Sequence, residues 1–306
     1  MTALPVSPRQ GRAADFSNPP LAAAPVTTRF APSPTGRLHQ GHAFSAQIAH
    51  DFARSRGGRF LLRIEDIDPG RAREEHVAGI FEDLAWLGIG WDGPVVRQSA
   101  RLPLYAAALA RLGAIGLTYP CFCTRAEIAA SASAPHGPEG PRYPGTCRRL
   151  PQAVRARRSG EPHAVRLDMA AAVARAGPLA WHDATAGVVV ADPLPHGDVV
   201  LARKDAPTSY HLAVTVDDAA QGVTDIVRGV DLFAATHVHR LLQALLDLPT
   251  PRYHHHPLLT GPDGRRLAKR DGAQSLAELR ASGFDPGWIV AALRARAPIG
   301  FARPSA

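Results

Sequence analysis

The chain has 306 residues, of which 45% are hydrophobic and 20% are charged, so it can bury a core and is not disordered overall. Lysine and arginine number 35 against 27 acidic residues, and the net charge of +8 suits an anionic partner such as a nucleic acid or a nucleotide phosphate. No apolar run approaches the roughly 18 residues that a membrane span requires. Three cysteines are too few for a disulfide scaffold, so we expect a cytoplasmic protein that does not bind membranes.

Strands and helices are predicted to alternate in the first third of the chain. Residues 26–30 form a β-prone run, and a Pro/Gly-rich loop leads from it to an amphipathic helix that ends at Gly57-Gly58. A buried-type strand follows at 60–64, and a second amphipathic helix ends at Gly88. This order indicates an α/β fold with a parallel sheet and crossover helices.

The pattern degrades between Pro120 and Asp198, where all three cysteines and a run of arginines lie, and it resumes with short apolar runs at 199–201 and 225–227. We interpret the degraded stretch as an insertion in the α/β domain. The expected division is a flexible tail at 1–25, the first half of the α/β domain at 26–119, an inserted subdomain at 120–198, the second half at 199–250, and a loop with a short helical segment at 251–306.

Two histidines lie where the first predicted strand leads into the first predicted helix. His39 and His42 are three residues apart, so at a helix start their imidazoles lie on one side. Backbone N–H groups and the helix dipole favour phosphate there, and Gly41 leaves space for a flat base. The pair could hold triphosphate oxygens while charge builds on the α-phosphate. Taken alone, such a spacing is more often a pair of ordinary surface histidines.

The sequence around these histidines resembles the class I glutamyl- and glutaminyl-tRNA synthetases, from residue 26 to about residue 275. The matched segments follow the family's order: Arg29–Gly36, His39–His42, Arg63–Asp68, Tyr210–Val214, Asp217–Asp218, Val227–Asp231 and Gly261–Arg270. Two positions depart from the family pattern, which has an aliphatic residue in place of Gln40 and a serine in place of Ala268. Both histidines and Lys269 are present, so the resemblance still implies ATP chemistry.

The resemblance implies that the α/β domain is a Rossmann-type nucleotide-binding catalytic domain. It also implies that the chain activates L-glutamate with ATP and Mg²⁺. It assigns the ATP phosphates to catalytic residues His39, His42 and Lys269, with Gly41 also at the ATP site. Lys269 is one of only two lysines, the other being Lys204, which favours a functional role. The residues implied for L-glutamate are Arg29, Phe30, Ala31, Pro32, Ser33, Glu65, Tyr210 and Arg228.

Charge assigns roles within this glutamate set. A side-chain carboxylate requires a guanidinium, which can bind it through two hydrogen bonds, and Arg29 and Arg228 are the matched candidates. Glu65 offers a counter-charge for the α-ammonium group, and Tyr210 offers a phenolic hydrogen bond. Adenylate formation needs no protein nucleophile, because positioning and charge stabilisation supply the rate.

The cysteines Cys121, Cys123 and Cys147 predict a metal site, since three thiolates leave a tetrahedral zinc one ligand short. The resemblance supplies Tyr143 as the fourth ligand, while His136 or water stays possible, and three buried free cysteines are the alternative to any metal. We interpret one Zn²⁺ per chain as structural, holding the inserted subdomain as an acceptor-type subdomain. The run 254–256 is three histidines, but side chains alternate along a strand, so we expect packing near the ATP site.

Only 36 residues follow Arg270, too few for the helical anticodon-binding domain of a complete glutamyl-tRNA synthetase. The short length and the arginine-lysine loop resemble a shortened branch of the family, which attaches glutamate to the queuosine nucleoside in the anticodon of tRNA(Asp). The implied partners are L-glutamate, ATP and the tRNA(Asp) anticodon loop, and we expect a monomer. The alternatives are a truncated synthetase that charges a tRNA 3′ end, a non-catalytic tRNA-binding paralogue, and a relative that makes an adenylate for another carrier.

Overall fold

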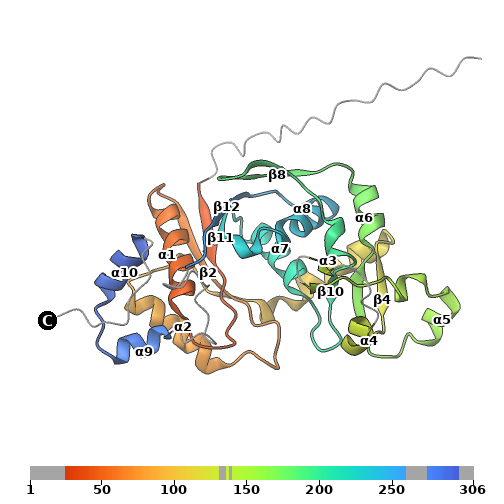
Figure 1. Cartoon of the computed structure of the whole chain (residues 1–306), viewed down its shortest axis with the longest axis horizontal. Helices are drawn as coiled ribbons and strands as arrows, with labels where there is room; N and C mark the ends of the chain where they lie inside the picture. The colour runs from red at the N-terminus through yellow and green to blue at the C-terminus, as the bar shows by residue number, and fades with distance from the viewer. Residues whose placement is uncertain (1–24, 131–135, 138–139, 260–273, 296–306) are drawn as a thin grey trace, which may run out of the picture.

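A computed structural model describes residues 25–130, 136–137, 140–259 and 274–295 (Figure 1). In the first half, β1 (Thr27–Phe30) leads through α1 (Gln40–Arg54) to β2 (Arg59–Ile64). The chain continues through α2 (Glu74–Trp86) to β3 (Val96–Arg97). Both β1 and β3 pair with β2 in parallel, so the predicted parallel sheet with crossover helices is confirmed in this half.

The second half repeats the arrangement. A helix, α7 (Tyr210–Ala220), precedes β11 (Asp225–Gly229), and α8 (Ala235–Leu245) connects β11 to β12 (Arg252–His256). These two strands pair in parallel over five residues, and β12 pairs in parallel with β8 (Ala180–Asp183). The predicted strand at 225–227 is therefore confirmed.

The two halves join along β1 and β11. The backbone N–H of Thr224 donates to the carbonyl of Thr27 at 3.0 Å, and the N–H of Thr27 donates to Thr224 Oγ1 at 2.8 Å. Further along, Arg29 Nη1 contacts the carbonyl of Val227 at 3.5 Å, so the two strands run in the same direction. The chain leaves β1 towards β2 on one side and leaves β11 towards β12 on the other. Such a switch point leaves a crevice at the carboxyl ends of the strands, where ligands bind in open α/β sheets.

The helix that begins at the crevice lies close to the sheet. The inner face of α1 is built mainly from the small side chains Ala43, Ala46, Ala49 and Ala53, which are almost fully buried with Phe44. Small side chains let a helix approach a sheet closely, and α1 contacts both β1 and β11. The expected short C-terminal helices are present as α9 (Leu276–Ala281) and α10 (Pro286–Arg294), which pack on α2 and α1 (Figure 1).

The middle of the chain does not follow the expected boundaries at 120 and 198. An antiparallel sheet joins β4 (Thr118–Cys121), β7 (Ala164–Leu167) and β10 (Val200–Ala202). The run at 199–201 was expected to resume the parallel sheet, and this was wrong, because β10 pairs with β7. Conversely, β8 comes from inside the degraded stretch and joins the parallel sheet. A short apolar run does not encode which strand it will pair with, so the pattern alone could not separate these cases.

The remaining elements are mostly short. They are α3 (Leu102–Ala114), α4 (Arg125–Ala130), β5 (His136–Gly137), β6 (Gly140–Pro141), α5 (Gln152–Arg157), α6 (Met169–Ala176) and β9 (Gly187–Val190). Within the described ranges, no helix is both long enough and apolar enough to cross a membrane.

Candidate active site

His39 and His42 cap the first helix with their own side chains. The N–H of Gly41 donates to Nδ1 of His39 at 3.0 Å, and the N–H of His39 donates to Nδ1 of His42 at 3.2 Å. The two rings lie 3.8 Å apart between centroids. Because both Nδ1 atoms accept, each neutral ring carries its proton on Nε2. The helix start therefore offers two imidazole N–H donors of fixed tautomer.

Gly41 is required for this arrangement. A Cβ at position 41 would lie 2.9 Å from Cε1 of the His39 ring, so any larger residue would displace that ring. The sequence predicted space for a base at Gly41, whereas the structure fills part of that space with the His39 side chain.

Lys269 lies outside the described residues, but both ends of its segment reach the site. Leu258 and Leu259 precede the segment and line the same cavity as the two histidines. After it, Ser275 forms a bridge with His39, and the N–H of Leu276 donates to the carbonyl of Leu38 at 2.9 Å.

Two cavities open at the crevice. The first, which we call the histidine cavity, has a volume of about 660 Å³. Its lining contains every described residue that was predicted to bind ATP or glutamate: Arg29, Phe30, Ala31, Pro32, Ser33, His39, Gly41, His42, Glu65, Tyr210 and Arg228. The structure thus brings together, in one cavity, side chains that lie up to 199 positions apart in the sequence.

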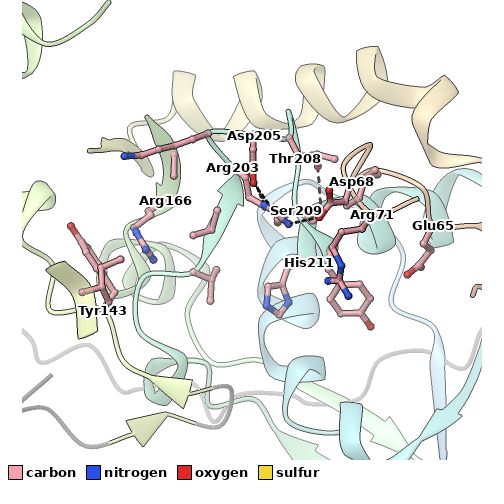
Figure 2. A pocket seen from close by; sticks show the side chains of 18 of the residues that line it. Glu65, Asp68, Arg71, Tyr143, Arg166, Arg203, Asp205, Thr208, Ser209 and His211 are labelled. Carbon is pink, nitrogen blue, oxygen red and sulfur yellow. Dashed lines mark hydrogen bonds and ion pairs between the residues drawn. The ribbon is translucent and has the colours of Figure 1, made fainter. Parts of the chain in front are cut away.

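The second cavity, which we call the cysteine cavity, has a volume of about 940 Å³ and reaches from Glu65 to Cys123 and Tyr143. Figure 2 shows Tyr143 and Arg166 on one side of it and Glu65 and Arg71 on the other. The two cavities are contiguous, because five residues line both of them: Ser33, Thr35, Glu65, Arg71 and Tyr210.

A buried network of charges lies behind the shared wall. The Arg63 side chain is 0% exposed and contacts Asp218 at 2.9 Å, Glu65 at 3.6 Å and Asp217 at 3.8 Å. Asp217 also accepts from Arg101 at 2.6 Å. The network links β2 to the last turns of α7 and so fixes the distance between the two halves of the domain. Although burial opposes its charge, the pKa of Arg63 is raised above its ordinary value by Asp218, Glu65 and Asp217.

Glu65 is the least compensated carboxylate of this network. Burial raises its pKa to about 7, and the attraction of Arg63 and Arg29 only partly offsets that effect. Its backbone N–H donates to the carbonyl of Pro32 at 3.0 Å, which holds the Ala31–Ser33 loop against the start of the acidic motif. Burial therefore favours the protonated form of Glu65 near neutral pH, and a bound cation favours the ionised form.

The two predicted carboxylate-binding arginines have different surroundings. Arg29 is already paired, since its Nε and Nη2 donate to the two oxygens of Asp218 at 3.0 and 3.4 Å. Arg228 is 5% exposed, and no acidic side chain among the described residues forms an ion pair with it. Its Nη1 atom faces Tyr210, whose hydroxyl oxygen is 3.4 Å away. Arg228 is thus a buried cation whose charge no described acidic side chain neutralises.

The three cysteines form a compact cluster. Their sulfur atoms lie within 4.8 Å of one another, and the Tyr143 hydroxyl is 3.4 Å from Cys121 Sγ and 3.7 Å from Cys123 Sγ. Tetrahedral zinc with Zn–S bonds of about 2.3 Å holds its sulfur ligands roughly 3.8 Å apart, so these donors fit the ion. Although burial opposes it, hydrogen bonds from Tyr143 and backbone N–H groups lower the pKa of Cys147 to about 7. The His136 side chain lies outside the described residues.

Several contributing residues had no predicted role. Arg63, Asp217 and Asp218 belonged to matched segments, but the sequence does not show that they pair with one another across 154 positions. Among the three consecutive histidines, only His255 contacts Arg228, at 3.1 Å. The alternation of side chains along a strand separates His255 from its neighbours, and that signal could have singled it out.

The crevice, the paired histidines at a helix start and the adjoining charged pocket lie where the resemblance to class I synthetases places the nucleotide and amino-acid sites. A family model described as "tRNA synthetases class I (E and Q), catalytic domain" matches residues 25–299. The chain belongs to this family, and its fold is the Rossmann-like catalytic domain of a class I tRNA synthetase, a ligase.

Individual relatives show which members of the family the chain resembles. It is 52% identical to the glutamyl-Q tRNA(Asp) synthetase of Rhodobacter capsulatus, in an alignment that covers 86% of this chain and 98% of the relative. It is 48% identical to the glutamyl-Q tRNA(Asp) synthetase of Symbiobacterium thermophilum, in an alignment that covers 86% of this chain and 83% of the relative. It is also similar to the crystal structure of a glutamate tRNA ligase from Elizabethkingia meningosepticum in complex with its amino acid. That similarity has a TM-score of 0.73 and 27% identity, and it covers 88% of this chain but 60% of the ligase.

The buried network generates a stability prediction. Replacing Arg63 by leucine leaves Asp218 and Glu65 without their shared cation, and we expect the free energy of unfolding to fall by about 3–5 kcal/mol. Urea denaturation followed by circular dichroism measures the loss. The matched control is Arg97→Leu, which removes an exposed pair with Glu74 and should leave the midpoint nearly unchanged. Equal midpoints for the two variants would contradict the role given to Arg63.

Proposed function

We propose that the chain activates L-glutamate with ATP and transfers it to the queuosine nucleoside in the anticodon of tRNA(Asp). The observation that carries this proposal is the similarity to glutamyl-Q tRNA(Asp) synthetases over almost the whole length of the relative from R. capsulatus. A truncated synthetase for a tRNA 3′ end is not favoured, since the chain is 52% identical to the glutamyl-Q tRNA(Asp) synthetase of R. capsulatus but 27% identical to the glutamate tRNA ligase that it resembles in structure.

Activation takes place in the histidine cavity. An oxygen of the glutamate α-carboxylate attacks the α-phosphorus of ATP, the bond to the β-phosphate oxygen breaks, and pyrophosphate leaves. The Nε2–H groups of His39 and His42 and the ammonium of Lys269 bind the phosphates as negative charge builds, and Mg²⁺ bound to ATP supplies further charge neutralisation. Glu65 pairs with the α-ammonium group of the substrate. Arg228 binds the side-chain carboxylate, and Arg29 and Tyr210 lie beside that carboxylate.

Transfer takes place where the two cavities meet. An acceptor hydroxyl in the cysteine cavity attacks the carbonyl carbon of the adenylate, AMP leaves, and the hydroxyl proton is lost to solvent or phosphate. The contiguity of the cavities at Glu65 and Tyr210 supports this route. Arg166 and Lys204 line the cysteine cavity, and their positive charge suits the phosphates of a tRNA loop, whereas Arg203 in the same lining is paired with Asp68 and Asp205.

We further propose one Zn²⁺ at Cys121, Cys123, Cys147 and Tyr143. The ion would cross-link β4 to the loop that carries Cys147 and so shape the wall of the cysteine cavity. Arg166 lies over the Tyr143 ring at 3.9 Å, and Lys204 donates to the carbonyl of Phe122 at 2.7 Å. These contacts place two cations beside the cysteine cluster.

The acceptor assay tests the function directly. We expect labelled glutamate to be incorporated into tRNA(Asp) that contains queuosine, and not into the same tRNA without queuosine or into tRNA(Glu). Charging of tRNA(Glu) would contradict the proposed acceptor. Failure of glutamate-dependent ATP–pyrophosphate exchange would contradict the activation step as well.

The pKa of Glu65 predicts a pH dependence of glutamate binding. Below about pH 7 the Glu65 carboxyl is protonated and cannot pair with the α-ammonium group, so KM for glutamate should rise as the pH falls, approaching about tenfold per pH unit. Pyrophosphate exchange at saturating ATP measures KM across this range. The Glu65→Gln variant should bind glutamate weakly at every pH. A wild-type KM that stays constant through neutrality would show that Glu65 does not meet the ammonium.

The unpaired guanidinium of Arg228 predicts the substrate preference. In Arg228→Ala a desolvated carboxylate loses its partner, so KM for glutamate should rise about 100-fold or more. Arg228→Gln should abolish the preference for the charged side chain without creating good glutamine activity. Arg29→Ala should lower stability as well as affinity, since it also removes a partner of Asp218. The control is Arg111→Ala, an exposed arginine paired with Asp247. If Arg228→Ala kept the wild-type KM for glutamate, a residue other than Arg228 would bind the side-chain carboxylate.

The cysteine cluster predicts the metal content. Protein purified without chelator should carry about one zinc per chain, and Cys147→Ser should lose it. Transfer should suffer more than adenylate formation, because the cluster borders the cysteine cavity. Thr124→Ala, beside the cluster, is the control. If elemental analysis finds no zinc in the fresh wild-type protein, the three cysteines are free thiols and the proposed metal site is wrong.

A further inference from the structure

Two of the three guanidinium nitrogens of Arg228 are held by neutral acceptors. Its Nε donates to Nε2 of His255 at 3.1 Å, and its Nη2 donates to Thr236 Oγ1 at 2.6 Å and to the carbonyl of Leu232 at 3.0 Å. The third nitrogen, Nη1, has contacts of 3.4 Å to the Tyr210 hydroxyl and to His239, and Arg228 and Tyr210 both line the histidine cavity. The orientation of Nη1 therefore depends on the acceptors that hold Nε and Nη2.

His255 is fixed in one tautomer. Arginine has no acceptor, so the imidazole nitrogen that Arg228 contacts must be unprotonated. The ring proton is then on Nδ1, which donates to Asp183 Oδ2 at 2.8 Å. Asp183 is 1% exposed and is itself held by the N–H groups of Thr185 and Ala186, both at 2.9 Å. Burial and the nearby Arg228 lower the pKa of His255 to about 4, so the ring stays neutral.

The chain of contacts keeps the charge of Arg228 available. Asp218 binds Arg29 directly and neutralises it, whereas a neutral imidazole separates Asp183 from Arg228. A carboxylate in direct contact would compete with a substrate carboxylate for the same guanidinium. The imidazole orients the guanidinium through a hydrogen bond without cancelling its charge, as a carboxylate–histidine pair does behind a metal ion.

We propose that Asp183 and His255 are positioning residues that set the guanidinium of Arg228 for recognition of the substrate's side-chain carboxylate. This inference rests on the proposed function, in which Arg228 binds that carboxylate. Neither residue is among the described residues that line the two cavities, so both act through Arg228. Asp183 lies on β8, which pairs with β12 at Tyr253. The stretch of chain between the cysteine cluster and α7 thereby contributes to glutamate recognition.

The test compares variants in glutamate-dependent ATP–pyrophosphate exchange, with ATP and glutamate varied in turn. His255→Phe keeps a ring of similar size but removes both hydrogen bonds. We expect KM for glutamate to rise about tenfold or more, with KM for ATP and kcat nearly unchanged. His255→Gln, whose amide can accept from Arg228 and donate to Asp183, should restore most of the affinity. Asp183→Asn should raise KM for glutamate in the same selective way.

The matched control is His254→Gln on the same strand. His254 also pairs with a buried carboxylate, Asp225, at 2.9 Å, but it does not contact Arg228. It should change thermal stability only. A wild-type KM for glutamate in folded His255→Phe, or equal increases in both KM values, would overturn the proposal. If His255→Phe does not fold, Asp183→Asn decides by the same two outcomes. Absence of exchange in the wild-type protein would instead contradict the proposed function.

Discussion

The site depends on a buried cation, Arg63, and the carboxylates around it. Charges without solvent are costly to bury, so each member of such a network depends on its partners, and removing one leaves a buried charge uncompensated. Asp218 pairs with Arg63 on β2 and with Arg29 on β1. Asp218 and its neighbour Asp217, which also contacts Arg63, lie in the last turns of α7. The network therefore ties together the strands and the helix whose ends form the crevice.

The arrangement leaves two groups whose charge is not balanced. Glu65 shares the cation Arg63 with Asp218, which is closer to it. Arg228 donates only to neutral groups: an imidazole, a hydroxyl and a backbone carbonyl. A substrate that brings an ammonium group and a second carboxylate completes both pairs. Fixed charges of this kind need no reorganisation when the substrate binds, which is how preorganised sites discriminate between ligands of similar shape.

The sequence predicted the parts that depend on local pattern. The parallel strands, the paired histidines and the clustered cysteines follow from periodicity, spacing and residue type. The pairing of β10 with β7, the partners of Arg63 and the raised pKa of Glu65 could not be predicted, because they depend on which distant segments meet and on how deeply they are buried. His255 is an intermediate case, since the strand alternation was visible but its partner Arg228 was not.

The same cavity wall serves both proposed steps, because Glu65 and Tyr210 line the histidine cavity and the cysteine cavity alike. The central claim is that Glu65 and Arg228 give the histidine cavity charges that are complementary to glutamate before it binds. Calorimetric titration of the free protein with L-glutamate and with L-glutamine, without ATP or tRNA and above pH 7, tests it most directly. The account predicts saturable glutamate binding and glutamine affinity lower by about 100-fold or more. Equal affinities for the two amino acids would contradict it.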